Sequence, residues 1–452
     1  MKGFVLTPEK IVDSMVAKLF DQSLPRKGDK ILDPGCGTGA FIEGVIRWCS
    51  KYHKPLPCIV GVESNPKHIQ EAIRKFEKYP SVDIRHQDFL LSTTERYDYV
   101  ICNPPYVPIT GLSEDEKTEY RSLFKTAQGR FDLYILFFEQ SLRSLNNGGR
   151  LVFITPEKFI YVATASKLRE LLGRKQVIEI QMISEGTFDN LTTYPTITVV
   201  DDHQRNANTR IIFRDGMVKE VKLPTTGVSW LPIINGVGQQ KKTVILEDIT
   251  LRVSCGVATG ADSVFVRKTR ELSPELQKFA YPTISGRELV AEDMPSTLYS
   301  MLIPYNENGK LLPESQLNPL ISYLTEPENF EKLNSRTCVA RKPWYAFHEN
   351  PPLNDILKPK ILCKDITAKA HFWIDWEGRI VPKHSVYYII PKNSAQIRQL
   401  CDYLNSEEVS SWIEAHCQRA ANDFLRLQSS VLKCIPIPGF LNTEKGECND
   451  AY

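Results

Sequence analysis

The residues Asn103-Pro104-Pro105-Tyr106 combine side-chain types that could hold a flat, amine-bearing molecule. They follow the apolar and aromatic run 97–102, which is typical of a buried strand. Because neither proline has an N–H to give to a sheet, the chain must leave the strand there with a stiff backbone. The turn presents an amide, prolyl carbonyls and an aromatic ring, a set that suits a nucleobase. A purely structural turn is the alternative interpretation.

A second predicted strand, 30–32, runs into the glycine-rich segment Asp33-Pro34-Gly35-Cys36-Gly37-Thr38-Gly39. Glycines let the backbone turn sharply and approach a ligand at a helix N-terminus. The spacing is not that of dinucleotide-binding loops, and no Gly-Lys-Ser/Thr follows as in a P-loop. A carboxylate in this place would repel phosphate but could hold a cationic amino group. The segment therefore indicates a ligand without phosphates.

Two acids end the next predicted strands. Glu63 closes the run 58–63 and lies 24 residues after Gly39, where an acid commonly accepts hydrogen bonds from ribose hydroxyls. Asp88, within 81–90, could accept the amine of an adenine ring while Phe89 packs beside it. Either acid alone could be a helix cap or a surface charge. Together with the glycine-rich segment, they describe an adenosyl pocket.

Length and composition set the outer limits. A chain of 452 residues is expected to form two or three domains, and 42% hydrophobic with 24% charged residues is typical of a soluble protein. No apolar run is long enough to span a bilayer and the N-terminus lacks a secretory pattern. Eleven scattered cysteines without a C-x-x-C pair favour reduced thiols in the cytoplasm, and no metal site is expected. A net charge of +2 means that any nucleic-acid surface must be local.

The elements that would position these residues alternate between strand and helix. The spacing of apolar residues predicts a helix over 8–20 with Thr7 as its N-cap, and Asn65-Pro66 starts another. Residues 107–130 lack periodicity and predict a loop. A helix is expected from about 130 to 145, stopped by 146–149, and strands at 151–156, 176–182 and 194–200. This order predicts an α/β, doubly wound sheet.

A linker-like composition near 220–245 predicts a domain boundary, which we place between residues 235 and 236. Residues 236–452 then predict a mixed α+β domain. Residues 331–370 carry eight Lys or Arg against four Asp or Glu. Cations interleaved with aromatics suit phosphates and base faces, so we expect DNA contacts from Arg341, Lys342, Trp344 and Tyr345. A solvated turn over a small core is the alternative.

The catalytic half resembles the class I S-adenosylmethionine-dependent methyltransferases. With the Asn-Pro-Pro-Tyr turn, most of the chain resembles the gamma-class N6-adenine DNA methyltransferases of the TaqI type, and residues 246–266 resemble the opening of their target-recognition domain. The resemblance implies a catalytic domain at 1–235 that binds S-adenosylmethionine and a DNA target-recognition domain at 236–452. One departure from the family pattern is conservative: Gly35 stands where the family often has alanine.

The resemblance also implies roles for individual residues. It implies Asn103, Pro104, Tyr106 and a second base-stacking aromatic, Phe188, as the catalytic set. It implies that the cofactor is bound by Thr7, Asp33, Pro34, Gly35, Gly37, Glu63, Asp88, Phe89, Asn103 and Pro105. Core packing is the alternative for Phe188. The expected partner is double-stranded DNA, which the protein binds as a monomer. The protein either accompanies a separately encoded restriction endonuclease or acts alone.

Several alternatives stay open. The same turn occurs in methyltransferases that act on protein glutamine or on RNA bases, although these usually lack a long C-terminal domain. N4-cytosine methylation is chemically possible, but Ser-Pro-Pro-Tyr is more usual there. A DNA-binding subunit with a degenerate cofactor fold is the non-enzymatic alternative.

Overall fold

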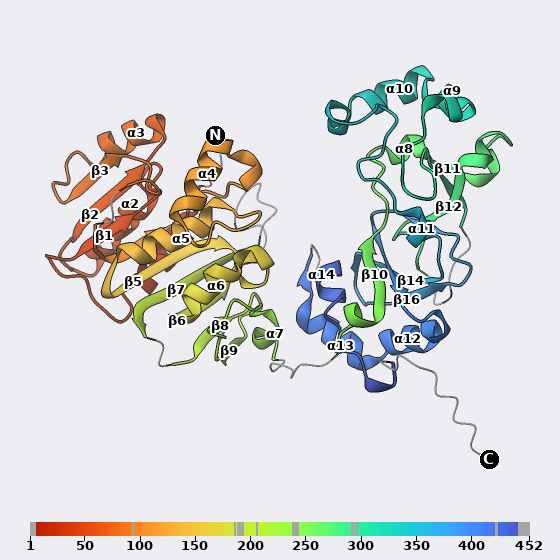
Figure 1. The fold of residues 1–452 in the computed structure, drawn as a ribbon. Coiled ribbons are helices and arrows are strands. Elements are labelled where there is room, and N and C mark those ends of the chain that lie inside the picture. Colours follow the sequence, from red (N-terminus) through yellow and green to blue (C-terminus); the bar gives the residue numbers. More distant parts are fainter. Residues whose placement is uncertain are drawn as a thin grey trace, which may run out of the picture. The chain divides into compact units, whose positions relative to one another are not determined.

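The computed structural model describes residues 6–92, 95–184, 187, 194–204, 207–236, 244–290, 293, 297–420 and 424–441. The chain divides into two compact units, Met1–Gln239 and Gln240–Tyr452 (Figure 1). Within the described ranges, no helix is long and apolar enough to cross a membrane.

The first unit is built on one sheet with the strand order β3-β2-β1-β4-β5-β7-β6-β8-β9. Its strands are β1 (Lys30–Asp33), β2 (Cys58–Glu63), β3 (Val82–His86), β4 (Tyr97–Cys102), β5 (Leu145–Pro156), β6 (Lys175–Met182), β7 (Pro195–Gln204), β8 (Thr209–Ile212) and β9 (Val218–Val221). The neighbouring strands β3, β2, β1, β4 and β5 run parallel to one another. Strand β7 lies between β5 and β6 and runs antiparallel to both. The expected α/β doubly wound sheet is confirmed.

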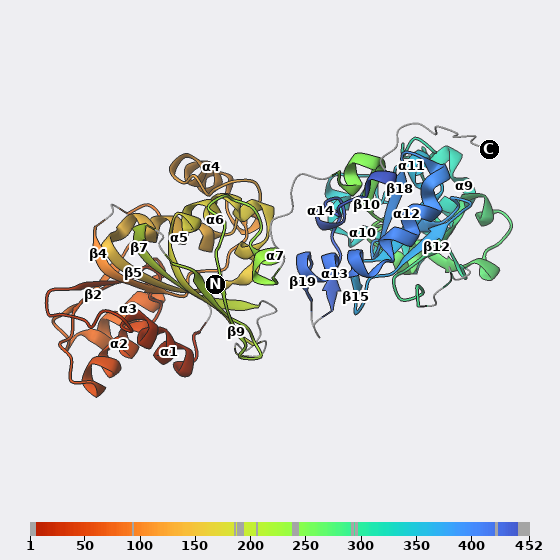
Figure 2. The ribbon, with the colours of Figure 1, turned by 90° about the horizontal axis from the view of Figure 1, so that it is seen from below.

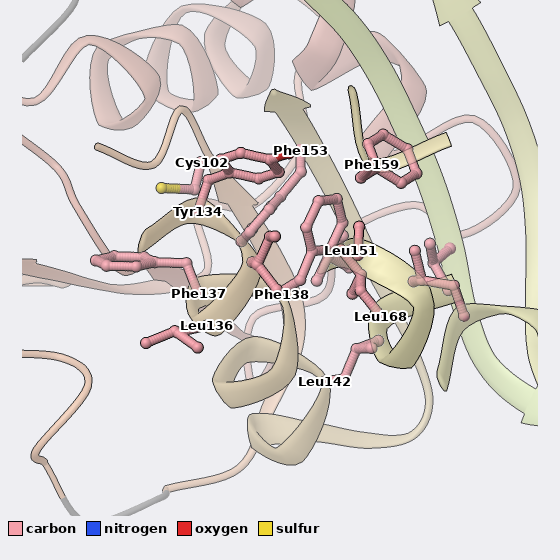
Figure 3. Packing of buried hydrophobic residues seen from close by; sticks show 14 of the residues in the cluster. Cys102, Tyr134, Leu136, Phe137, Phe138, Leu142, Leu151, Phe153, Phe159 and Leu168 are labelled. Atoms are coloured by element: carbon pink, nitrogen blue, oxygen red, sulfur yellow. The ribbon is translucent and has the colours of Figure 1, made fainter. Parts of the chain in front are cut away.

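Helices cover both faces of this sheet (Figure 2). They are α1 (Glu9–Leu19), α2 (Ala40–Lys51), α3 (Pro66–Phe76), α4 (Glu114–Leu123), α5 (Leu133–Ser144), α6 (Ser166–Gly173) and the short α7 (Leu231–Ile234). One hydrophobic cluster joins α1, α2 and α3 to the sheet, and a second joins it to α4, α5 and α6. In the second cluster α5 lies on β5, where the Phe138 ring centroid is 4.8 Å from that of Phe153 (Figure 3).

Some sequence-based predictions were wrong. Thr7 is not the N-cap of α1, because Pro8 holds that position without a side-chain hydrogen bond. The predicted loop 107–130 contains α4, which begins with a capping box formed by Ser113 and Glu116. Strand β5 begins at Leu145, directly after α5, so 146–149 belong to the strand and do not separate the two elements.

In its described residues, the second unit is a mixed α+β structure with three smaller sheets, β10-β18-β14-β16, β11-β13-β12-β17 and β15-β20-β19. Its strands are β10 (Thr250–Cys255), β11 (Val266–Lys268), β12 (Ala280–Ile284), β13 (Tyr299–Leu302), β14 (Lys360–Lys364), β15 (Ile366–Thr367), β16 (Phe372–Asp375), β17 (Val381–Pro382), β18 (Val386–Pro391), β19 (Gln418–Arg419) and β20 (Leu425–Arg426). Its helices are α8 (Asp262–Phe265), α9 (Asn318–Leu324), α10 (Pro327–Asn334), α11 (Leu353–Ile356), α12 (Ile397–Leu404), α13 (Glu407–His416) and α14 (Ser429–Leu432).

Candidate functional site

A cavity of about 410 Å³ lies at the carboxyl ends of β1, β2 and β4, which are neighbours in the sheet. Parallel strands deliver the residues that follow them to the same edge, so segments distant in sequence meet here. Eight of the residues expected to form the site line this cavity: Thr7, Pro34, Gly35, Glu63, Asp88, Phe89, Asn103 and Pro105. Asp33, Gly37, Pro104 and Tyr106 are not among the lining residues, and Phe188 lies outside the described residues.

Glu63 organises the glycine-rich loop. Its Oε2 accepts a hydrogen bond from the Gly37 N–H at 2.9 Å, and its Oε1 accepts one from the Asn65 N–H at 2.7 Å. The carboxylate therefore holds both the loop after β1 and the start of α3. Gly37 therefore supports the shape of the loop through its N–H and does not line the cavity. Each carboxylate oxygen has a further lone pair, so these bonds are compatible with a ligand hydroxyl.

Gly39, at the start of α2, requires glycine. Its φ is +87°, a conformation that residues with a Cβ rarely adopt. A Cβ built here would lie 2.2 Å from the Phe76 ring of α3. The loop is therefore pressed against α3, and the third glycine of the motif serves helix packing.

Asp33 is 1% exposed, and neither of its carboxyl oxygens makes a hydrogen bond of normal geometry among the described residues. Burial raises the pKa of Asp33 well above its usual value; the Gly35 N–H opposes the rise, and the nearby Glu63 charge adds to it. Among the described residues, the Gly35 N–H is the donor that acts on this carboxyl group, and no cationic side chain forms an ion pair with it.

Asp88 and two aromatic rings form another part of the cavity wall. Asp88 Oδ1 accepts a hydrogen bond from the Leu90 N–H at 2.9 Å, and the Tyr120 hydroxyl of α4 lies 3.5 Å from Oδ2. Loss of solvent raises the pKa of Asp88, which these two donors partly oppose. The Phe89 and Phe137 ring centroids are 5.4 Å apart. An acceptor beside aromatic rings is suited to an adenine ring.

The Asn-Pro-Pro-Tyr turn leaves β4 at the same edge. Asn103 lines the cavity, and its amide Nδ2 donates a hydrogen bond to Thr7 Oγ1 at 3.0 Å. Pro104 is buried, whereas Tyr106 is half-buried. The Tyr106 hydroxyl donates to the Ile154 carbonyl on β5 at 3.2 Å, and its ring lies edge-on to Tyr134. The ring is thus held in a fixed orientation.

Sequence reasoning missed several cavity-lining residues, notably His68 on α3 and Phe137 on α5. Almost every residue of α5 is buried, so its sequence has no polar face that would mark which residues point toward a ligand. His68 could have been suspected from its place two residues after Pro66, in the first turn of a helix that follows Glu63.

The expected DNA contacts in the second unit are in different environments. Arg341 is exposed, and Lys342 Nζ donates to the His348 carbonyl at 2.9 Å. Trp344 is half-buried, with its Nε1 donating to Glu314 at 3.1 Å. Tyr345 is 6% exposed and its hydroxyl donates to the Leu312 carbonyl, so the expectation that this ring faces DNA is not supported. Its aromatic surface is used by the core.

Comparison with known proteins shows which class of protein the chain resembles. Residues 47–188 match the model of the Eco57I restriction-modification methylase family, and residues 313–437 match the TaqI-like C-terminal specificity domain. The two matches confirm the expected resemblance to TaqI-type methyltransferases.

Individual relatives agree with this class. The chain is 26% identical to the type II methyltransferase M.PaeR7I of Pseudomonas aeruginosa, over 97% of this chain and 86% of that protein. It is 27% identical to M.XhoI of Xanthomonas vasicola, over 79% of this chain and 71% of that protein. The solved structure of the type IIL restriction-modification enzyme MmeI in complex with DNA has a similar fold, with a TM-score of 0.63 and 13% identity over 94% of this chain and 63% of that one.

Proposed function

We propose that this protein transfers a methyl group from S-adenosylmethionine to the N6 amino group of an adenine flipped out of duplex DNA. The observation that carries the proposal is the shared cavity: Asn103 and Pro105 of the turn line the same space as Glu63 and Asp88. An amine acceptor and an adenosyl pocket thus adjoin each other. Double-stranded DNA as partner is supported by the match to a TaqI-like specificity domain.

The exocyclic nitrogen of adenine is a poor nucleophile, because its lone pair is delocalised into the ring. The Asn103 side-chain oxygen and the Pro104 carbonyl are proposed to accept its two N–H bonds, which turns the lone pair out of the ring plane. S-adenosylmethionine, when bound, supplies a methyl group activated by a sulfonium. The protein then needs only to align nitrogen and methyl carbon, so orientation accounts for most of the rate.

The flipped base loses its stacking in the duplex, at a cost of a few kcal/mol. We propose that the Tyr106 ring, together with Phe188, replaces those contacts, since base–aromatic stacking contributes roughly 1–3 kcal/mol per base. Arg341, Lys342 and Trp344 are proposed to contact the DNA backbone or bases from the second unit. A monomer on DNA, acting alone or beside a separate endonuclease, is part of the same proposal.

The test is transfer of labelled methyl from S-adenosylmethionine to duplex DNA, followed by nucleoside analysis. N6-methyladenine is the expected product. N4-methylcytosine would show that the target base is wrong, and label in RNA or in protein glutamine would favour the alternative substrates.

Asn103→Ala should lower the single-turnover rate by about 10²–10³-fold, the usual effect of losing a group that stabilises the transition state, while cofactor affinity stays near wild type. Asn146→Ala is a matched control, because Asn146 also makes a side-chain hydrogen bond, to Asp98 at 2.7 Å. Asn146 lies near the N-terminal end of β5, at the sheet edge opposite to the cavity. If Asn103→Ala retained most of the wild-type rate, Asn103 would have no role as an acceptor.

A further inference from the structure

The hydrogen bond between Thr7 and Asn103 joins two segments that the sequence separates widely. Asn103 Nδ2 donates to Thr7 Oγ1 at 3.0 Å, and both residues line the cavity. Thr7 lies just before α1 and is 8% exposed, so its hydroxyl is held among protein atoms and faces the site. The contact fixes the rotation of the Asn103 amide about its last side-chain bond.

The orientation of this amide decides what the turn can bind. The oxygen and the NH₂ group of an asparagine have nearly the same shape but opposite hydrogen-bonding character. A target amine carries N–H donors, so it can be held by the amide oxygen and is repelled by the amide NH₂. If the Asn103 amide were rotated by 180° about its last side-chain bond, its NH₂ group would face the N–H donors of the target amine.

A hydroxyl can pair with either end of an amide, because it has one proton and two lone pairs. Because the hydroxyl has only one proton, it can pair with only one end of the amide once that proton is used elsewhere. If Thr7 gives that proton to an acceptor in the cavity, only its lone pairs remain, and only the Asn103 NH₂ group can meet them. S-adenosylmethionine carries such acceptors in its carboxylate and ribose oxygens.

We propose that Thr7 is a positioning residue for Asn103: when the occupant of the cavity accepts the Thr7 proton, the hydroxyl locks the amide with its oxygen toward the target amine. This inference rests on the proposed function for the identity of the occupant and of the target. It goes beyond a contact between Thr7 and the cofactor, because the bound cofactor then decides which end of the Asn103 amide faces the target amine.

The test compares Thr7→Val, which keeps the shape and removes the hydroxyl, with Thr7→Ser, which restores it. At saturating S-adenosylmethionine, Thr7→Val should slow single-turnover methyl transfer to DNA by about tenfold through misorientation of the acceptor, and Thr7→Ser should restore the rate to within about twofold. Thr209→Val is the matched control, because the Thr209 hydroxyl also makes a hydrogen bond, to the Val177 carbonyl at 2.9 Å, on β8.

A second readout does not depend on activity. In protein labelled with ¹⁵N-asparagine, the Asn103 side-chain signal is identified by its loss in Asn103→Ala. Addition of S-adenosylhomocysteine should slow hydrogen exchange of this NH₂ group about tenfold in wild type and Thr7→Ser, but not in Thr7→Val, which lacks the acceptor.

The outcomes separate the two ideas. A wild-type protein that transfers no methyl to DNA would contradict the proposed function, while the exchange measurement would still decide the Thr7 contact. A Thr7→Val protein with the wild-type transfer rate, or with the same exchange protection as wild type, would overturn the inference. A loss confined to cofactor affinity would also overturn it.

Discussion

Asp33 combines nearly complete burial with a carboxyl group that lacks hydrogen-bond partners of normal geometry among the described residues. Its pKa is raised, so the folded protein binds the proton more tightly than the unfolded chain does. For such a group, folding stability is highest below the unfolded pKa of about 3.9 and falls as the pH rises through the higher folded value. At neutral pH, Asp33 therefore destabilises the free protein.

Asp33→Asn should therefore stabilise the ligand-free protein at neutral pH. The amide cannot ionise, so the free-energy cost of charging this buried group is absent at neutral pH. The unfolding midpoint of the first unit should rise by about 2–4 °C for each kcal/mol, measured calorimetrically at pH 7.5 without ligand. The further rise on adding S-adenosylmethionine should become smaller, because the carboxylate proposed to attract its ammonium group is lost. A lower midpoint in the free variant would show that Asp33 stabilises the fold.

Tyr106 allows ring and hydroxyl to be separated. Tyr106→Phe loses the bond to the Ile154 carbonyl, worth about 1 kcal/mol of stability, but keeps the ring for stacking. Tyr106→Ala also loses the stacking contact of roughly 1–3 kcal/mol, so its rate of methyl transfer to duplex DNA should fall about tenfold or more below that of Tyr106→Phe. Equal losses in the two variants would contradict a stacking role.

The sequence was informative where a residue follows a strand. Glu63 ends β2 and Asn103 directly follows β4, and the parallel sheet brings them to one edge, as the pattern of strands predicted. Phe137 could not be predicted, because it is contributed by a helix that is buried on nearly all sides. Tyr345 was predicted to contact DNA but is buried. A run of cations and aromatics does not show which aromatic ring packs in the core and which is exposed.

At the scale of elements, the glycine-rich loop depends on the close approach of α2 and α3. Gly39→Ala should be strongly destabilising, because a Cβ would meet the Phe76 ring at 2.2 Å. Gly148→Ala is a matched control: its φ is +80°, close to that of Gly39, but nothing lies within 4 Å of its Cβ position. Gly148→Ala should cost only the backbone strain, about 1–2 kcal/mol.

Denaturant unfolding measures both costs, and binding of S-adenosylmethionine should weaken only in Gly39→Ala. If the two variants were equally destabilised, the contact with Phe76 would be unimportant and the φ angle alone would explain the need for glycine.

Helix α4 shows why an element escaped prediction. Only Tyr120 of its residues is buried, so the helix lacks the apolar stripe by which helices are recognised. Its N-terminus has a capping box, and after its C-terminus the buried Glu139 carboxylate accepts the Thr126 N–H at 2.9 Å. The sequence Ser113-Glu114-Asp115-Glu116 carried the capping signal, whereas the Glu139 contact is tertiary and leaves no local pattern.

At the scale of the whole molecule, each hydrophobic cluster lies within one unit. The two clusters around the large sheet involve described residues up to Ile234, and the other two begin at Val244. The two clusters of each unit share the strands of one sheet, so they should unfold together as one cooperative domain. The full-length protein should therefore unfold in two transitions that respond separately to ligands.

Calorimetry of the full chain tests this separation. A ligand that binds only the folded state, at about 100 times its Kd, stabilises the unit that holds it by about 2.7 kcal/mol. S-adenosylmethionine should raise the transition of the first unit, and a duplex containing the recognised site should raise that of the second. Asp33→Asn assigns the transitions, because its midpoint change must fall in the first one. A single transition that shifts as a whole with either ligand would show that the two units unfold together, and that binding energy gained at one is shared by both.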